Sequence, residues 1–221
     1  MPLYFQKEYQ NSKPLASKEC FVDWGRVWYT WRTMFRIFPK RKWDVLGSTY
    51  KLKTPYWQVR RDRCKTLRGH KVDYYVIERQ DAAAIVAFTA KHKVVLVRQY
   101  RHPIKEWVLE APAGLIEQGE NPKKAAQREL AEETGYAVDA LKLMGRFYLA
   151  PGIIDQRWNL YIGFNAKRVG GENRDPGEDM EVVVMNFDRA LQMVTRGSLQ
   201  EIDTVLALLY AKDYVRKHGL L

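Results

Sequence analysis

Residues 114–136 constrain the fold more than any other part of this sequence, because their pattern predicts a loop, then a helix, then a residue that ends the helix. Asn121 can cap a helix by accepting from its free backbone N–H groups, and Pro122 suits the first helical position, where no N–H partner is needed. Gly135 can take the left-handed conformation that ends a helix. The segment therefore predicts a helix over 122–134.

Three carboxylates fall on one side of this predicted helix. Glu129 and Glu133 are four residues apart and Glu132 is three from Glu129, while Ala126 and Leu130 can face a sheet. Like charges at this spacing cost about a few tenths of a kcal/mol per pair, so the helix gains from them only beside a cation. Mg²⁺ prefers oxygen ligands and often binds carboxylates together with substrate phosphates. For three glutamates alone, a solvated acidic face is the alternative.

The rest of the segment favours the metal site. The chain has Gly114, then Glu120 after five residues, Arg128–Glu129–Leu130 after seven more, Glu132–Glu133 after one, and Gly135 after one. This spacing resembles, position for position, the Nudix box of the Nudix hydrolase superfamily. Tyr136 is hydrophobic where the final position is more often aliphatic. The resemblance implies a pyrophosphate hydrolase that depends on Mg²⁺, with Mn²⁺ as an alternative.

The resemblance also implies roles for residues. Glu129 and Glu133 would bind metal through their carboxylates, the backbone carbonyl of Ala113 would join them, and Glu132 would ligate metal or orient water. Such a centre would neutralise the anionic oxygens that repel a nucleophile from a pyrophosphate.

Other positions would shape the loop or supply the base. Glu120 and Arg128 match the structural ion pair of the family, and Gly114 would let the loop approach the phosphates closely. A base must reach the attacking water from elsewhere. The resemblance points to Glu178, three residues before Glu181–Val182, although other carboxylates share residues 172–181.

Outside this segment the pattern is mostly that of strands. Runs rich in β-branched and aromatic residues predict strands at 57–59, 72–77, 82–88, 94–97, 141–148, 160–164 and 182–186, with turns at Gly47, Pro55, Gly69 and 91–93 and a closing helical part at 188–217. Strand-rich segments with few helices predict an α+β fold, a mixed sheet covered by helices. The Nudix fold, a mixed sheet sandwiched between helices, agrees with this prediction.

The first 44 residues carry a separate pattern. Apolar residues recur at helical spacing over 23–38, with arginines largely elsewhere, and Pro39 ends the run. The spacing predicts a basic amphipathic helix that docks on its own protein or a partner subunit. Peripheral membrane contact through 23–42 is the alternative, which we do not favour.

Composition narrows the class. Residues 1–101 carry 22 Lys and Arg against 8 Asp and Glu, whereas residues 102–221 carry 15 against 18. We interpret the basic half as a wall for an anionic substrate rather than a nucleic-acid surface. The sequence shows no apolar run long enough to span a membrane and no secretory signal. Its two cysteines do not form a disulfide framework or a zinc motif, which favours a cytoplasmic protein.

Flanking residues select a group within the superfamily. Pro151, fifteen residues past the box, and the approach Val97–Arg101 followed by Leu109–Gly114 resemble the ADP-ribose pyrophosphatase and nucleoside diphosphate sugar hydrolase group. Arg101 would then clamp phosphate, and Tyr75 would stack on a base of the same or the other subunit. The alternatives are a surface role for Arg101 and a place in the core for Tyr75. Leu115 and Pro151 complete the candidate substrate-binding set.

The resemblance implies three regions: an N-terminal extension over 1–44, a strand-rich dimerisation segment over 45–80 and a Nudix hydrolase domain over 81–221. We expect a homodimer that cleaves ADP-ribose or a related nucleoside diphosphate sugar to a nucleoside monophosphate and a sugar phosphate. The alternatives are hydrolysis of a nucleoside triphosphate or dinucleotide, and a Nudix domain that binds a ligand and regulates a partner.

Overall fold

The computed structural model describes residues 21–23, 28–30, 42–173, 177 and 179–220. The chain forms two compact units, one of residues 1–44 with 65–71 and the other of residues 45–64 with 72–221. The first unit contains a two-stranded antiparallel sheet of β1, Phe21–Asp23, and β2, Trp28–Thr30.

The helix predicted over 23–38 is wrong where the structure describes this segment. Trp28–Thr30 is a strand, paired with Phe21–Asp23. Aromatic and β-branched residues favour strands, although their spacing here also fits a helix. The remainder of the predicted helix lies outside the described residues. No helix in the described part of the chain is long and apolar enough to cross a membrane.

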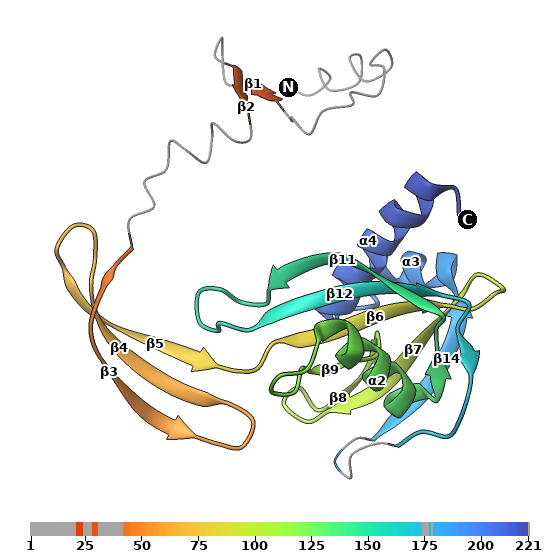
Figure 1. The fold of residues 1–221 in the computed structure, drawn as a ribbon, viewed down its shortest axis with the longest axis horizontal. Helices are drawn as coiled ribbons and strands as arrows, with labels where there is room; N and C mark the ends of the chain where they lie inside the picture. The colour runs from red at the N-terminus through yellow and green to blue at the C-terminus, as the bar shows by residue number, and fades with distance from the viewer. Residues whose placement is uncertain (1–20, 24–27, 31–41, 174–176, 178, 221) are drawn as a thin grey trace. The chain divides into compact units, whose positions relative to one another are not determined.

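The second unit is built on a seven-stranded mixed sheet (Figure 1). The path runs β11-β12-β6-β7-β14, while β8 pairs with β7 and β9 pairs with β6. The strands are β6, Ala82–Phe88; β7, Lys93–Arg101; β8, Glu106–Glu110; β9, Ala113–Leu115; β11, Ala140–Tyr148; β12, Arg157–Phe164; and β14, Met180–Asn186. The pair β12–β6 is parallel and the others are antiparallel, so the sheet is mixed as predicted.

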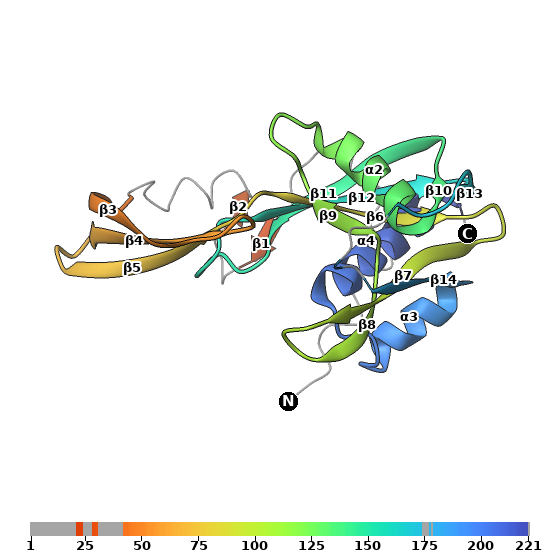
Figure 2. The same ribbon diagram turned by 90° about the horizontal axis from the view of Figure 1, so that it is seen from below.

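Helices cover both faces of this sheet. In Figure 2, α2 (Pro122–Thr134) lies on one side, whereas α3 (Phe187–Thr195) and α4 (Ile202–His218) lie on the other. All seven residues of β6 are buried, and alternate residues divide between two cores. Ala83 and Ile85 pack with Leu130 of α2, whereas Val86 packs with Leu208 of α4. This arrangement is the predicted α+β fold with a sheet between helices.

The bounds of α2 are those that the sequence predicts. Asn121 accepts a hydrogen bond from the backbone N–H of Lys123 at 2.9 Å, and Pro122 occupies the first turn. Gly135 ends the helix with φ 70°, and a Cβ there would press on the carbonyl of Gly170. The closing helical part differs from the prediction, because residues 196–201 separate α3 from α4.

A three-stranded sheet precedes the Nudix-box sheet in the chain. It has the order β3-β4-β5, with β3 at Asp44–Lys53, β4 at Gln58–Lys65 and β5 at Lys71–Glu78. Gly47 lies inside β3 and not in the predicted turn. Asp62 of β4 accepts from Ser48 at 2.6 Å and from Arg60 at 2.8 Å. These bonds satisfy a buried carboxylate and lower its pKa, with Arg60 as the main cause.

Two small strands complete the described elements. They are β10, Tyr136–Ala137, and β13, Lys167–Arg168, which pair antiparallel. β10 directly follows α2 in the chain. Backbone bonds from Val169 to Gly135 and from Asn173 to Glu132 continue the contact between this region and the end of α2. Residues 169–173 thereby contact the end of the helix that carries the clustered glutamates.

Candidate active site

A cavity of about 1000 Å³ lies at the end of the sheet where β9 meets α2 and α4. The residues that line it come from the Nudix-box segment, from the connection before β6, from β6 to β9, from the start of β12 and from the start of α4. Those that matter below are Arg79, Ala82, Arg101, Glu110, Ala113, Gly114, Leu115, Arg128, Glu129, Glu132, Glu133, Gln156, Trp158, Glu201, Asp203 and Thr204.

The strand β9 places the box carboxylates at this cavity. Ala113 pairs with Ala84 and Gly114 pairs with Ala83, so the two β9 residues face opposite sides of the sheet. Gly114 faces the α2 side, and a Cβ on it would occupy the space of the Glu129 carboxylate. On α2, buried Glu133 accepts from the backbone N–H of Ala113 at 3.2 Å. The carboxylates of α2 thus contact the backbone of β9 and join the loop to the helix.

Arg128 is the centre of the charge network. Its Nη1 donates to Glu129 at 2.8 Å and to Glu132 at 2.9 Å. Its Nη2 donates to the backbone carbonyl of Leu115 at 3.0 Å and to Glu120 at 3.0 Å, and its Nε donates to Glu120 at 3.1 Å. These contacts, led by Glu120, raise the pKa of the Arg128 guanidinium further above its ordinary value.

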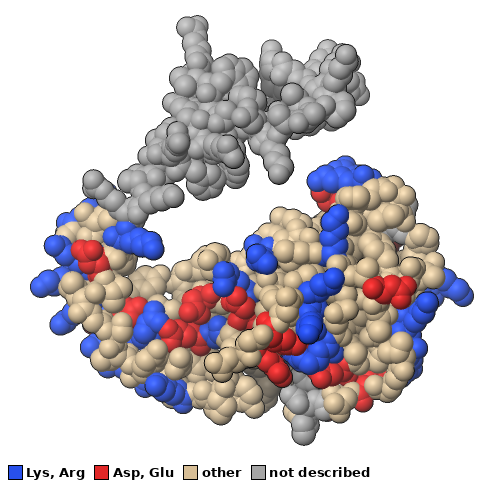
Figure 3. All heavy atoms as spheres, viewed as in Figure 1, with Lys and Arg blue, Asp and Glu red and all other residues tan. Residues whose placement is uncertain are grey.

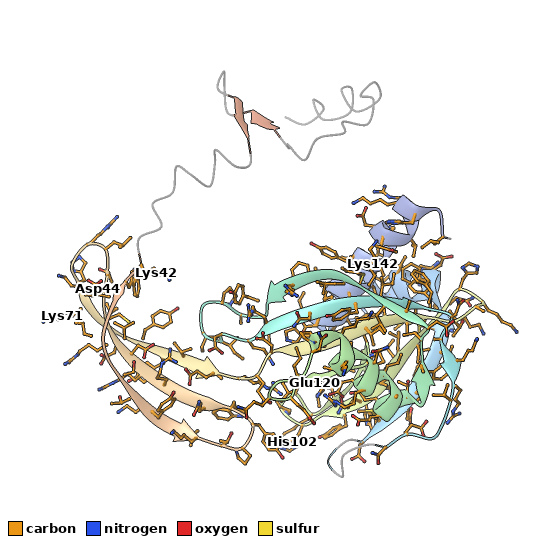
Figure 4. The ribbon with its side chains drawn as sticks, viewed as in Figure 1. Lys42, Asp44, Lys71, His102, Glu120 and Lys142 are labelled. Atoms are coloured by element: carbon orange, nitrogen blue, oxygen red, sulfur yellow. The ribbon has the colours of Figure 1, made fainter. Side chains whose placement is uncertain are left out.

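Glu120 closes the loop at the start of α2 and is labelled in Figure 4. It receives two hydrogen bonds from Arg128 and one from the backbone N–H of Glu117 at 3.0 Å. The hydrogen bonds from Arg128 are the main reason why the pKa of Glu120 is lowered. A bidentate pair of this kind fixes orientation as well as charge, so it holds the glycine loop against the helix.

The side chains at this end of the cavity fit a hard divalent cation by their chemistry. Glu129, Glu132 and Glu133 supply carboxylate oxygens, and Ala113 lines the same space. One guanidinium nitrogen contacts both Glu129 and Glu132, which shows that a cation can lie between these two carboxylates. Among the described residues, no three acidic, histidine or cysteine side chains converge in a preformed metal cluster.

Two arginines supply positive charge on another wall. Arg101 of β7 makes a two-pronged ion pair with buried Glu110 of β8, in which Nε lies 2.8 Å from the carboxylate, and this pair raises the pKa of Arg101. Arg79 lies in the connection before β6, and its backbone N–H donates to the Asp155 carboxylate at 3.3 Å, whereas its guanidinium makes no ion pair with a carboxylate of the described residues. Burial, and then repulsion by Arg101, lower its pKa. Two neighbouring guanidiniums with one carboxylate favour an anionic ligand.

The start of α4 adds two acidic residues, half-buried Glu201 and buried Asp203. Glu201 caps the helix by accepting from the backbone N–H groups of Asp203 at 3.0 Å and Thr204 at 2.7 Å. Asp203 is 9% exposed, and burial is the main cause that raises its pKa to about 7, with Glu201 and Glu110 adding to the effect. Thr204 accepts from the backbone N–H of Ala111 at 2.8 Å, which ties α4 to the end of β8.

The remaining predicted residues fall in different places. Leu115 and Arg101 line the cavity, whereas Tyr75 is 52% exposed on β5 and does not line it. Pro151 is exposed in the turn after β11, also away from the lining. Glu178 lies outside the described residues. Tyr75 is therefore neither a core aromatic nor, within one chain, a wall of this cavity.

Several lining residues carried no signal that we used in the sequence. Arg79 follows β5 directly, and Glu110 lies within a motif that we had read only as the approach to the box. Gln156 reaches the cavity from the position before β12, and Asp203 reaches it from the first turn of α4. Only pairing across the sheet shows that these residues share one space.

The fold and the box define a class. Residues 78–205 match the model of the NUDIX domain, and the chain belongs to the Nudix family.

Named relatives place it further within that family. It is 33% identical over 137 residues to the ADP-ribose pyrophosphatase of Bacillus subtilis, covering 61% of this chain and 74% of that protein. It is 33% identical over 136 residues, with the same coverage of both chains, to the methanol dehydrogenase activator of Bacillus methanolicus. It is 32% identical over 152 residues to a GDP-mannose pyrophosphatase of Escherichia coli, covering 64% of this chain and 77% of that protein.

A solved structure agrees on the fold. The crystal structure of an ADP compounds hydrolase is similar to this chain with a TM-score of 0.73 and 21% sequence identity. The likeness covers 82% of this chain and 98% of that chain. It extends beyond the NUDIX domain match and supports the predicted Nudix fold.

Proposed function

We propose that this protein hydrolyses the pyrophosphate bond of ADP-ribose or a related nucleoside diphosphate sugar, giving a nucleoside monophosphate and a sugar phosphate. One observation carries the proposal: the carboxylates of the Nudix box and the Arg79–Arg101 pair line the same cavity. The first group suits a divalent cation and the second suits phosphate oxygens. The pyrophosphatases among the relatives, named for ADP-ribose and GDP-mannose, support the substrate class.

Arg79 and Arg101 would bind the diphosphate from the wall opposite the box. Glu110 holds Arg101 in place with two hydrogen bonds, so this guanidinium is oriented before a ligand enters. The Arg79 guanidinium makes no ion pair with a carboxylate of the described chain, and an incoming phosphate would relieve its repulsion with Arg101. In Figure 3 acidic and basic side chains lie interleaved over the visible face around α2.

Glu129, Glu132, Glu133 and the carbonyl of Ala113 would hold Mg²⁺, with Mn²⁺ as the substitute. The bound cation would neutralise phosphate charge and activate water. Arg128 would hold Glu120 and the Leu115 carbonyl, and so keep the loop closed on the helix. Glu178 is our proposed base, on the strength of the resemblance, because the attacking water needs a proton acceptor outside the box.

The test is a substrate panel with a matched pair of variants. The purified protein with Mg²⁺ should release AMP from ADP-ribose or a nucleoside monophosphate from at least one nucleotide sugar. Glu133→Gln should lower kcat by about a thousandfold or more, since it removes charge where it is needed in the transition state. Glu106→Gln makes the same change on exposed β8 and should retain activity. A panel without any product would refute the proposal.

The exposed edge strand β3 of the three-stranded sheet supports a homodimer. All ten residues of β3 are exposed, including Val45, Leu46, Tyr50 and Leu52. An exposed apolar edge strand favours association, and the occupant that we propose is a second copy of this chain. Light scattering on the eluting protein should give twice the chain mass. A monomeric mass at micromolar concentration would contradict the dimer.

A regulator is the second candidate, because one relative is named as an activator of methanol dehydrogenase. The retained box carboxylates favour catalysis over binding alone. The substrate panel separates the two, since a regulator would bind a nucleotide without turnover. We propose the cytoplasm as its location, which agrees with the free thiol of buried Cys64.

A further inference from the structure

Two side chains in the cavity wall have polar atoms without a partner. Gln156 directly precedes β12 and is 1% exposed, and Trp158 lies two residues further along the chain. The Gln156 Oε1 and the Trp158 Nε1 are both buried and make no hydrogen bond with any described residue. The other end of the Gln156 amide is fixed, because its Nε2 donates to the backbone carbonyl of Gln80 at 2.7 Å. Both residues line the cavity.

Buried polar atoms without a partner are rare in folded proteins and commonly mark a place for a ligand or an ordered water. Here the two atoms differ in kind. The amide oxygen can only accept a hydrogen bond, and the indole N–H can only donate one. A group that donates and accepts at once, such as a hydroxyl, satisfies both.

The register of the sheet locates this pair relative to the Nudix box. Trp158 pairs with Ala82 on β6, and Ala82 pairs with Leu115 on β9. Residues directly opposite each other point to the same face, so the three form one row across the cavity floor. Neighbouring strands are about 4.8 Å apart, which places the Trp158 backbone roughly 10 Å from that of Leu115.

The middle residue of this row is small, because Ala82 has only a methyl group, and it also lines the cavity. The row faces the α4 side of the sheet, whereas Gly114 faces the α2 side. The two sides are joined at the Leu115 end, because the backbone carbonyl of Leu115 accepts from Arg128 of α2, and the cavity is lined from both sides. A diphosphate held at that end would direct its substituent along the floor towards Gln156 and Trp158. The pair therefore lies where a group attached to the diphosphate would end.

We propose that Gln156 and Trp158 recognise a hydroxyl of the sugar linked to the diphosphate, an assignment that rests on the proposed function. The hydroxyl donates to Gln156 Oε1 and accepts from Trp158 Nε1. Asp203 and Glu201, which line the cavity from α4, add polar groups suited to further hydroxyls. A flat base would instead need a free aromatic face, whereas the Trp158 ring packs against the core beneath α4.

The test compares two substrates that share a base and a diphosphate. One is a nucleoside diphosphate sugar that the protein turns over, and the other is the methyl ester of the same nucleoside diphosphate. Trp158→Phe keeps an aromatic ring but removes the indole N–H donor. It should lower kcat/KM for the sugar substrate about tenfold, the effect of one lost hydrogen bond. The value for the methyl ester should not change.

Two further variants control this result. Gln156→Met removes the acceptor and should also lower kcat/KM for the sugar substrate. This variant keeps the proposal testable if Trp158→Phe does not fold. Trp107→Phe removes an indole from exposed β8, outside the cavity, and should leave both substrates unaffected. Thermal melts of each variant report whether it is folded.

The outcomes are separable from those of the proposed function. Equal losses for both substrates would show that the pair serves the fold or the shared base and diphosphate, and this result overturns the inference. If the wild type hydrolyses neither ligand, the proposed function fails, and calorimetric titration of both ligands decides instead. A tenfold weaker Kd for the sugar ligand in Trp158→Phe supports recognition of the hydroxyl, whereas equal affinities, or no binding, refute it.

Discussion

At the scale of single residues, Gly114 connects backbone geometry to the proposed metal site. Its α-carbon faces the Glu129 carboxylate so closely that any side chain would displace that group. We predict that Gly114→Ala lowers kcat about a hundredfold while the fold is retained, because small displacements of catalytic groups carry costs of this size. Steady-state kinetics and circular dichroism measure the two effects.

Gly47→Ala is the matched control, since a Cβ at Gly47 meets no atom within 4 Å. It should preserve full activity. Equal activity of the two alanine variants would show that the Glu129 carboxylate does not need its present position.

Asp203 gives a prediction about pH. The folded protein retains the Asp203 proton up to about pH 7, mainly through burial, whereas an ordinary aspartate releases it near 3.8. Between these values the folded state binds more protons, so Asp203 makes the free energy of unfolding fall as pH rises. Asp203→Asn removes this dependence and keeps a donor towards Glu201. Its stability relative to the wild type should rise from pH 4 to 7 and then level off.

Urea unfolding across this pH range measures the difference. The groups that face Asp203 are Glu201 on its own helix and Glu110 on β8, and Glu110 is already paired with Arg101. Asp213→Asn, on the exposed part of α4, is the control, because its ion pairs lower the pKa of Asp213. A stability difference for Asp203→Asn that stays constant with pH would contradict the assignment.

At the scale of elements, α2 has a cap whose contribution can be measured. Asn121 accepts from Lys123 N–H, so Asn121→Ala should lower the free energy of unfolding by about 1 kcal/mol. Asn186 occupies the same position before α3 but makes no side-chain capping bond. Asn186→Ala should therefore have almost no effect in urea unfolding. Similar losses in both variants would show that the Asn121 bond contributes nothing specific.

The same element shows why some of the fold could be predicted. Its start and end depend on Asn121, Pro122 and Gly135, which act within one turn of the chain, and the predicted bounds agree with the structure. Long buried strands such as Ala82–Phe88 were also predicted, because their composition alone is distinctive. The predicted helix of the N-terminal extension was wrong over Trp28–Thr30, where apolar spacing fits both a helix and a strand.

Short strands were not predictable in this way. The strand β9 has three residues, and it exists because Ala113 and Leu115 pair with β6 about thirty residues earlier in the chain. The break between α3 and α4 has a local signal that the prediction did not use, because Gly197 is left-handed with φ 70°, and Leu199 then packs into the core. Elements that form through distant contacts leave weak signals in the sequence.

At the scale of the whole molecule, the cavity joins segments from β5 to α4. The sequence identified the box glutamates and Arg101, because a fixed spacing carries them. Arg79, Gln156 and Asp203 were missed, since nothing in their neighbours indicates that the sheet brings them together. Residues of a sequence motif could therefore be predicted from the sequence. The residues proposed to bind the rest of the substrate could not, because the topology of the sheet brings them together.

Phosphorus NMR of the full-length protein incubated with Mg²⁺ and ADP-ribose, or the nucleotide sugar that it prefers, tests the central claim most directly. The two diphosphate resonances should disappear together and give equal amounts of two phosphomonoesters, one of them the nucleoside monophosphate. Glu133→Gln should leave the diphosphate intact over the same period. Persistent diphosphate with the wild type, or release of inorganic phosphate in place of a sugar phosphate, would contradict it.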